Sequence, residues 1–248
     1  KIGGESVLVT FHPHPRKVLF PEQSQMKLIN SQEEKIELLR KAGLDHLVII
    51  PFSLDFSKTS SHEFVSRMLV EQLGARVIVV GQGHHFGHGR QGDYSYLHRL
   101  SREMNFEVEE IPLKDIENET VSSTKIRKAI GEGNVQRANA YLDHQYIIRG
   151  PLRAAEAFYC DGPCFSIDIL AEEKLAPPPG IYAGNLFFDG DWMKCMILIT
   201  KDSLAANRVS FHLIDDRIEP RGQEVTLYFY KSVWLQKDDN ASLSHEVL

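Results

Sequence analysis

Short apolar runs alternate with segments of helical periodicity through the first 150 residues, and this alternation constrains the fold more than any other feature of the chain. The apolar runs are Ser6–Phe11, His46–Phe52 and Arg76–Gly81, and Phe106–Ile111, in which apolar residues and glutamates are mixed, is expected to be a fourth strand. Short runs bounded in this way are typical of buried strands. Strands that alternate with helices are joined by right-handed crossovers, so the pattern predicts an open, mostly parallel sheet with helices on both faces. In such sheets, ligands bind beyond the carboxyl ends of the strands.

The segments between these strands carry the start and stop signals of helices. Ser31 precedes a run that places Ile36, Leu38 and Leu39 on one face, and Gly43 ends that run. Further helices are expected within Ser60–Gly74, Asp93–Asn105 and Thr124–Gly133. The last of them is short and closes at one of its two final glycines.

The rhythm changes at about Tyr146, where runs rich in β-formers are separated by Pro, Gly and Asp clusters. These runs are Ala176–Phe188, Trp192–Thr200, Val209–Asp215 and Glu224–Trp234. They predict a compact antiparallel sheet or barrel as a second domain. We therefore expect an α/β domain over residues 1–145 and a smaller β-barrel domain over residues 146–248.

Composition narrows the classes of partner and the compartment. A formal net charge of -6 argues against a general binder of nucleic acid, which needs surplus Lys and Arg. The three cysteines, Cys160, Cys164 and Cys195, are odd in number and fit reduced thiols in a cytoplasmic protein better than a disulfide framework. No apolar run approaches the roughly 20 residues that span a bilayer. Small molecules are the expected partners, and the oligomeric state is left open.

The stretch VSSTKIR, Val121 to Arg127, has the composition of an anion site. Hydroxyls and free backbone N–H groups gather at a helix start, where the helix dipole is positive. Lys125 and Arg127 add charge, and an arginine can hold two phosphate oxygens at once. The alternative is an ordinary N-cap followed by solvated cations.

The stretch VVGQGHHFGHGRQGD, Val79 to Asp93, packs glycines and histidines behind a strand. A metal site, a phosphate cradle and the floor of a larger pocket are all compatible with it. A zinc site would use His84, His85 and His88. Adjacent histidines on an extended segment point in opposite directions, and no carboxylate or cysteine stands at ligand spacing, so the zinc interpretation is the weakest of the three.

Four blocks in order resemble the amino-terminal half of bacterial bifunctional riboflavin kinase/FMN adenylyltransferases, the prokaryotic FAD synthetases. They are VTFHPHPRKVL (Val9–Leu19), PFSLDFSKTSSHEFV (Pro51–Val65), the glycine stretch, and VSSTKIR followed by GEGNVQRANAYL (Gly131–Leu142). The resemblance covers about residues 5 to 150. It implies a nucleotidyltransferase-type, Rossmann-like sheet and a reaction in which FMN and MgATP give FAD and pyrophosphate.

The resemblance also implies residue roles. The ATP-binding residues would be Ser122, Ser123, Thr124, Arg127 and Gly81, with His14 and Arg127 as catalytic groups that contact the phosphates. The flavin-binding residues would be Phe52, Phe56, Phe86 and Arg90. The alternatives are a turn residue pinned between two prolines for His14 and core packing for Phe52 and Phe56.

Two departures from the family pattern stand in the amino-terminal half. The His-x-Gly-His motif that stabilises the transferring phosphates normally precedes the first block, and none stands before that block in this chain. We expect that motif upstream of Lys1 in the full protein. Gly83 also stands where many members have an acidic or amide residue, which removes one specific hydrogen bond to the ligand.

The second half resembles a riboflavin kinase module whose phosphate-binding segment has changed. Ala155 and Tyr159 replace loop glycines, and CFSID replaces the usual Phe-Pro-Thr-Ala-Asn. Ser166 and Asp168 are oxygen donors that fit a relic Mg²⁺ site. The usual Arg-x-Glu is replaced by VWLQKDD, and CDGPC, Cys160 to Cys164, is expected to be a turn. We expect a kinase-like barrel with little or no kinase activity.

Two other functions stay open at this stage. One is a non-catalytic paralogue that binds flavin or adenine nucleotide. The other is a nucleotidyltransferase of the same fold that acts on a different phosphate substrate.

Overall fold

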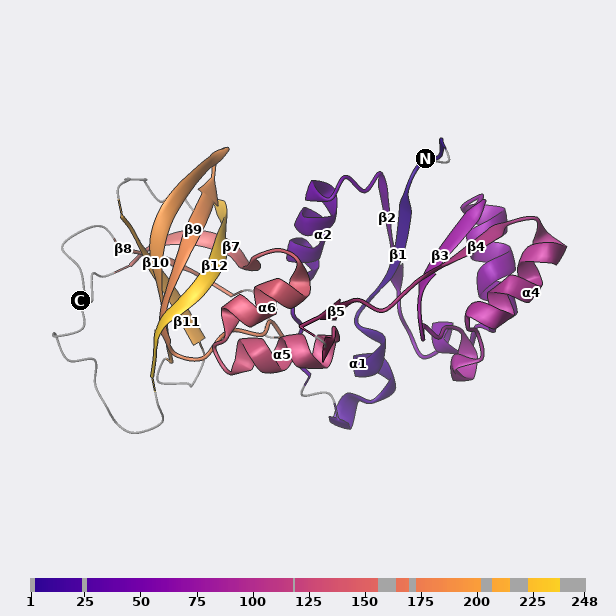
Figure 1. The fold of residues 1–248 in the computed structure, drawn as a ribbon, viewed down its shortest axis with the longest axis horizontal. Coiled ribbons are helices and arrows are strands. Elements are labelled where there is room, and N and C mark those ends of the chain that lie inside the picture. Colours follow the sequence, from indigo (N-terminus) through magenta and orange to yellow (C-terminus); the bar gives the residue numbers. More distant parts are fainter. Residues whose placement is uncertain are drawn as a thin grey trace. The chain divides into compact units, whose positions relative to one another are not determined.

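The chain forms two compact units that interleave along the sequence. The computed structural model of the protein describes residues 3–23, 26–117, 119–155, 164–169, 173–201, 207–214 and 223–236. The first unit comprises residues 1–25 and 44–120, and the second comprises residues 26–43 and 121–248. Figure 1 shows the ribbon coloured along the sequence.

The strands of the first unit pair as the sequence predicts, in parallel. β1 (Val7–His12) pairs with β2 (His46–Pro51), and β3 (Val77–Gly81) pairs with β4 (Glu107–Ile111). Within the described residues these are two separate two-stranded sheets, and a short antiparallel pair, β5 (Asp115–Ile116) with β6 (Glu119–Thr120), follows. Each parallel pair encloses a crossover that contains helix, which confirms the α/β class.

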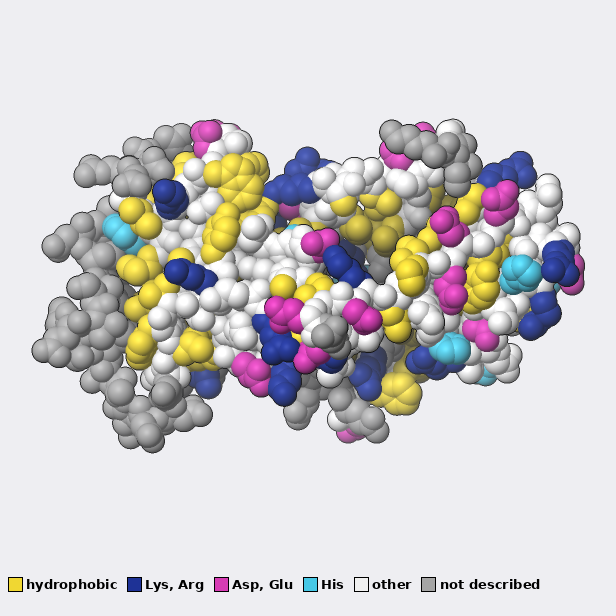
Figure 2. All heavy atoms as spheres, in the orientation of Figure 1, with side chains coloured by type: hydrophobic (Ala, Val, Ile, Leu, Met, Phe, Trp, Pro, Cys, Tyr) yellow, Lys and Arg dark blue, Asp and Glu magenta, His cyan; other side chains and the backbone are white. Residues whose placement is uncertain are grey.

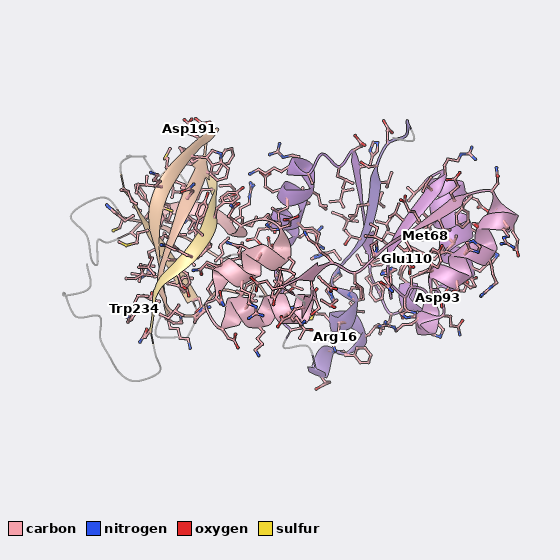
Figure 3. The ribbon with its side chains drawn as sticks, viewed as in Figure 1. Arg16, Met68, Asp93, Glu110, Asp191 and Trp234 are labelled. Carbon is pink, nitrogen blue, oxygen red and sulfur yellow. The ribbon has the colours of Figure 1, made fainter. Side chains whose placement is uncertain are left out.

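The helical segments of the first unit lie between successive strands: two between β1 and β2, three between β2 and β3, and two between β3 and β4. They are α1 (Pro15–Leu19), η1 (Pro21–Gln23), η2 (Phe56–Lys58), α3 (Ser61–Glu63), the π-helix η3 (Phe64–Gln72), η4 (His88–Arg90) and α4 (Tyr94–Met104). Asp93, labelled in Figure 3, caps α4 by accepting a hydrogen bond of 2.7 Å from the backbone N–H of Tyr96. The buried core of this unit consists of Val65, Ile78, Leu97, Leu100 and Phe106.

The helices of the second unit show clear capping signals. α2 (Gln32–Lys41) starts with a full capping box, in which the Ser31 hydroxyl and the Glu34 carboxylate each accept from the other residue's backbone N–H. α5 (Ser123–Gly131) and α6 (Val135–Leu142) pack against each other, and α6 contacts two strands of the barrel (Figure 1). Gly133, with a φ of +75°, closes the turn after α5, as the sequence predicts.

The second unit is built on a closed, antiparallel β-barrel, which confirms the predicted architecture of the carboxyl-terminal half. Its strands are β7 (Tyr146–Ala155), β8 (Cys164–Ile167), β9 (Gly180–Phe188), β10 (Asp191–Lys201), β11 (Asn207–Leu213) and β12 (Glu224–Leu235). They close in the order β10-β11-β8-β7-β12-β9. Side chains alternate between the interior and the surface, and Tyr146, Tyr182, Phe211 and Phe229 fill the interior.

The two units do not divide at residue 145. Helices α5 and α6 belong with the barrel, and so do residues 26–43, which include α2. The reason is visible in the contacts of α2 with β7 and of α6 with β7 and β12. The assignment of one activity to each half of the sequence stays a prediction.

Charged side chains of both signs are interspersed on the face shown in Figure 2, with several large hydrophobic side chains among them. The exposed hydrophobic residues include Leu54, Trp192 and Val233, each more than half exposed. No helix among the described residues is both long enough and apolar enough to cross a membrane.

Candidate functional site

An aromatic cluster lies in the first unit, after the carboxyl ends of β1 and β2. Phe11 contacts Phe52 and Phe56 at ring-centroid distances of 5.5 and 5.6 Å, and Phe52 lies 5.8 Å from Phe56. Phe64 joins the cluster at 6.4 Å from Phe56, and Phe86 follows at 6.0 Å from Phe64. Three of the four residues predicted to bind flavin are therefore brought together by tertiary packing.

These rings are partly accessible rather than sealed in a core. Phe52, Phe56 and Phe86 are all half-buried. Partly exposed aromatic side chains at strand ends suit the binding of a flat, apolar ring system, because they bury more surface when the ring arrives. Sequence reasoning missed Phe11 and Phe64. Two sequence features could have identified them: Phe11 lies near the end of a predicted strand, and Phe64 lies on the apolar face of a predicted helix.

The glycine loop, which we define as His84–Gly92, folds into a compact structure after β3. The backbone groups of Phe86 and Gly92 exchange two hydrogen bonds of 2.9 Å. A Cβ at Gly92 would lie 2.5 to 2.8 Å from the Phe86 ring, so only glycine allows this closure. Gly81, at the end of β3, has nothing within 4 Å of the place a Cβ would occupy. The backbone of the loop is therefore kept close to the aromatic cluster.

The glycine loop carries Arg90 and three histidines, His84, His85 and His88. Arg90 is exposed and has a left-handed backbone, with a φ of +58°. Partial burial lowers the pKa of His84, and the charges of His85 and Arg90 lower it further. His84 stacks on Phe86 with a ring-centroid distance of 6.3 Å. This shift favours the neutral imidazole of His84, which adds ring surface beside Phe86.

His14 stands at the amino end of α1, where it acts as the N-cap. Its Nδ1 accepts a hydrogen bond of 3.2 Å from the backbone N–H of Arg16. A neutral imidazole whose Nδ1 accepts carries its proton on Nε2. The cap role matches the turn interpretation of the sequence, and a role of Nε2 toward phosphate stays a prediction.

The predicted phosphate motif forms the start of α5 in the second unit. Ser122 is the N-cap, and its hydroxyl accepts a hydrogen bond of 3.3 Å from the backbone N–H of Lys125. Ser122, Ser123 and Thr124 are exposed. The Nε of Arg127 donates a hydrogen bond of 2.9 Å to the backbone carbonyl of Lys27, so this half-buried guanidinium is tethered rather than free in solvent.

Of the residues proposed as a relic magnesium site, Ser166 lies on the outside of β8 and Asp168 directly follows that strand. Ser166 and Asp168 alternate with the buried Phe165 and Ile167. The Asp168 carboxylate forms an ion pair of 3.2 Å with Arg153, which opposes Ser166 in the β7–β8 register. Ala155 ends β7, and Tyr159 and Cys160 lie outside the described residues. Within the described part of the chain, no group of three or more His, Cys, Asp or Glu side chains could hold a metal ion.

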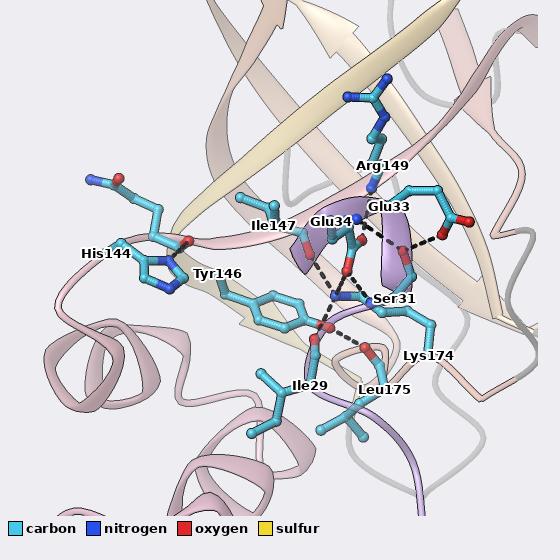
Figure 4. A network of polar contacts seen from close by, with 11 residues as sticks. Ile29, Ser31, Glu33, Glu34, His144, Tyr146, Ile147, Arg149, Lys174 and Leu175 are labelled. Atoms are coloured by element: carbon cyan, nitrogen blue, oxygen red, sulfur yellow. Dashed lines mark hydrogen bonds and ion pairs between the residues drawn. The ribbon is translucent and has the colours of Figure 1, made fainter. Parts of the chain in front are cut away.

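A buried polar network that sequence reasoning missed ties residues 26–43 to the barrel (Figure 4). Lys174 donates to the Glu34 carboxylate at 2.6 Å and to the backbone carbonyls of Ile29 and Ile147 at 2.6 and 2.8 Å. Its ammonium lies 4.2 Å from the centre of the Tyr146 ring, whose hydroxyl donates to the Leu175 carbonyl. No local sequence pattern marks this network, because Glu34 and Lys174 are 140 residues apart.

The proposed site residues are therefore divided between the two units. His14, Gly81 and the predicted flavin residues belong to the first unit, and Ser122–Arg127 belongs to the second.

Comparison with known proteins gives the family. The model of the FAD synthetase family matches residues 1–125, which is half of the chain. Bifunctional riboflavin kinase/FMN adenylyltransferases are similar over nearly the whole chain. The protein from Listeria monocytogenes is 28% identical over 239 residues, covering 92% of this chain and 74% of the relative. Those from Pseudomonas fluorescens and Escherichia coli strain K12 are 24% and 22% identical, and cover 94% and 92% of this chain and 76% and 74% of the relatives.

A solved structure shares the fold. A crystal structure named as a macrolide-efflux protein from Streptococcus pneumoniae superposes with a TM-score of 0.79 at 22% identity, covering 96% of this chain and 78% of that chain.

Proposed function

Because the chain belongs to the FAD synthetase family, we propose that it transfers the adenylyl group of ATP to FMN, forming FAD and releasing pyrophosphate. The observation that carries this proposal beyond the family match is the start of α5. Three exposed hydroxyl residues stand there, and Arg127 follows in the same helix with its guanidinium bound to the Lys27 carbonyl. A helix amino terminus of this composition suits a polyphosphate.

The chemistry needs no nucleophile from the protein. An oxygen of the FMN phosphate attacks the α-phosphorus of ATP in line, and the bond from that phosphorus to the bridging oxygen breaks as pyrophosphate leaves. The protein accelerates such a step by positioning the reactants and by neutralising charge around the phosphates. Ser122, Ser123 and Thr124 would hold the phosphates of ATP, and Arg127 would stabilise the charge of the transferring group.

The aromatic cluster would hold the flavin. Phe52, Phe56 and Phe86 offer apolar faces to an isoalloxazine ring, and Arg90 offers a cation to the FMN phosphate. Space is open at the Cβ position of Gly81, at the end of β3, and the nucleotide would use it. His14, at the amino end of α1, would contact a phosphate oxygen through its imidazole.

Magnesium would enter with the nucleotide as MgATP. Mg²⁺ is commonly held by substrate phosphates, water and one or two protein oxygens, so it requires no cluster of carboxylates. The Ser166 and Asp168 pair suits a metal poorly, because Arg153 already compensates the Asp168 charge. We therefore propose that phosphorylation of riboflavin at the barrel is weak or absent.

A cytoplasmic location belongs to the same proposal. Cys195 is a free, buried thiol, as expected in a reducing compartment. Burial raises the pKa of the Cys195 thiol to about 12, which keeps it unreactive.

The proposal is tested with purified protein that carries its native amino terminus. FMN with MgATP should yield FAD, and riboflavin with MgATP should yield no FMN, with both products separated by chromatography. Arg127→Ala should lower the turnover number for FAD roughly 100-fold, the usual cost of one donor to a developing charge. Lys128→Ala is the matched control, because this exposed neighbour points to Glu132, 3.8 Å away. Equal activity of the two variants would remove Arg127 from the phosphate site.

A further inference from the structure

The segment Ser57–Ser61, which we call the brace, runs along the glycine loop and binds its backbone. The backbone N–H of His88 donates to the Thr59 carbonyl at 2.9 Å. The Nδ1 of His88 lies 3.1 Å from the Ser57 carbonyl, so this ring nitrogen carries the proton and donates it. The Ser61 hydroxyl donates to the Phe86 carbonyl at 3.2 Å. Three hydrogen bonds therefore join the brace to the loop.

Gly87 and Ser61 are packed so closely that only glycine fits at position 87. Gly87 has a φ of +73°, and a Cβ added there would lie 2.7 Å from both the Cα and the backbone nitrogen of Ser61 and nearer still to its hydroxyl. Those neighbours are backbone atoms of a residue that is only 4% exposed, so they have little room to move. The contact holds the loop backbone directly on the first turn of α3.

The helix η3, which continues directly from α3, also contacts the ring of Phe86 in the glycine loop. Phe64, which follows α3, lies 6.0 Å from Phe86, and Tyr96 of α4 lies 6.4 Å from it on an edge. Phe86 is thus held at its carbonyl by Ser61 and at its ring by Phe64. Arg90 lies three residues beyond the Gly87 contact, and its backbone N–H donates to the Gly87 carbonyl at 3.1 Å.

We propose that the brace is the element that sets the position of the flavin-binding side of the loop, with Ser61 and Gly87 as positioning residues for Phe86 and Arg90. The proposal rests on the adenylyl transfer proposed above. Ser61 and Gly87 would not touch the substrate. They would act by keeping the loop in the one conformation that binds it, which lowers the entropy lost when FMN is bound.

This role predicts a specific split in the kinetic constants. When the loop is no longer fixed, it binds FMN more weakly. The loss is the same in the ground state and in the transition state, so KM rises while kcat stays nearly constant. Gly87→Ala should raise the KM for FMN about tenfold or more, with kcat and the KM for ATP within about twofold of wild type. Ser61→Ala removes one hydrogen bond without a clash and should raise the KM for FMN about threefold.

Gly74→Ala is the matched control. Gly74 also has a left-handed backbone, with a φ of +65°, but nothing lies within 4 Å of its Cβ position. The two alanine variants therefore share the backbone strain and differ in the clash. A similar rise of the KM for FMN in both variants would overturn the proposal, as would a fall of kcat at constant KM in Gly87→Ala.

Hydrogen exchange separates failure of the brace from failure of the proposed function. The amides of Phe86, His88 and Gly92 are donors in the loop and its brace contacts, and they should be protected in wild type. Gly87→Ala should remove this protection while leaving that of Leu97 in α4. If the wild type makes no FAD but Gly87→Ala loses the protection of the loop amides, the proposed adenylyl transfer is refuted and the structural role of the brace is supported. If those amides exchange equally fast in wild type and Gly87→Ala, the brace itself is refuted.

Discussion

Lys174 and Glu34 form an ion pair whose side chains are each only 1% exposed. The carboxylate also accepts from the backbone N–H groups of Ser31 and Arg149, and the ammonium also donates to two carbonyls. Desolvation makes a buried charge costly, and these additional hydrogen bonds offset part of that cost. Burial nevertheless lowers the pKa of Lys174 from 10.5 to about 8, although the charge of Glu34 raises it.

This shift predicts a pH dependence of stability. Between pH 8 and 10.5 the unfolded chain keeps the proton of Lys174 while the folded protein has released it, so the unfolded state holds more protons. The free energy of unfolding should therefore rise with pH, by roughly 1 kcal/mol from pH 7 to pH 9. Urea unfolding across this range measures the effect.

The control for that experiment removes the titrating pair. In the double variant Lys174→Met/Glu34→Gln the rise should vanish, while all other groups titrate as in wild type. The range stops at pH 9 because burial also raises the pKa of the Cys195 thiol from 9.0 to about 12, which makes stability fall at higher pH. If the free energy of unfolding of the wild type, relative to that of the double variant, stays constant or falls from pH 7 to pH 9, the burial assigned to Lys174 is contradicted.

At the scale of elements, α2 shows how a helix is attached at both ends. Its first turn carries the capping box and the buried Glu34, and its last residue, Lys41, meets the barrel. The Lys41 ammonium lies 4.5 Å from the Phe187 ring centre, 4.9 Å from that of Tyr228 and 5.7 Å from that of Trp192. It also donates to the Tyr228 hydroxyl and lies 3.4 Å from the Glu37 carboxylate.

Lys41→Met should release the end of α2 from these rings. Loss of a partly desolvated cation–π contact should lower the free energy of unfolding by about 1 kcal/mol. Trp192 is one of two tryptophans, so the emission of the folded protein should also change. Lys128→Met, on an exposed face of α5, is the control and should leave both quantities unaltered. Unchanged tryptophan fluorescence in Lys41→Met would show that the Lys41 ammonium does not contact these three rings in solution.

At the scale of the whole molecule, the barrel unit depends on residues that precede most of the first unit in the chain. Leu28 bridges to Lys174, and its backbone exchanges hydrogen bonds with Glu173 and Leu175 at 2.7 and 2.8 Å. Residues 26–43 thus supply both a β-bridge and a helix to a barrel that begins at residue 146. The chain passes between the two units three times, after residues 25, 43 and 120.

This arrangement predicts that a barrel fragment needs the inserted segment. A fragment of residues 121–248 should have a lower Tm than the same fragment with a peptide of residues 26–43 added, because ligands that bind only the folded state stabilise it. Scanning calorimetry with and without the peptide measures the difference. The same peptide with Glu34→Ala should raise the Tm of the fragment far less. Equal effects of the two peptides would show that the Glu34–Lys174 ion pair does not contribute to binding of the peptide.

Local features of the fold were predictable from the sequence. Strands β1 to β4, the Ser31 and Ser122 caps and the closing Gly133 follow from apolar runs and short-range capping chemistry, which act between residues only a few positions apart. The predicted barrel is confirmed, but β7 and β8 were missed. The segment around β8 carries polar residues at every second position and lacks a long apolar run.

The sequence by itself determined the class of each half, the family resemblance and the residue types at each candidate site, because periodicity and motif spacing are local properties of the chain. Only the tertiary structure decided which residues meet. The membership of α2 in the barrel unit, the Glu34–Lys174 pair and the packing of Gly87 on Ser61 join positions 26 to 140 residues apart. Such contacts depend on how whole elements pack, and no short-range pattern encodes them.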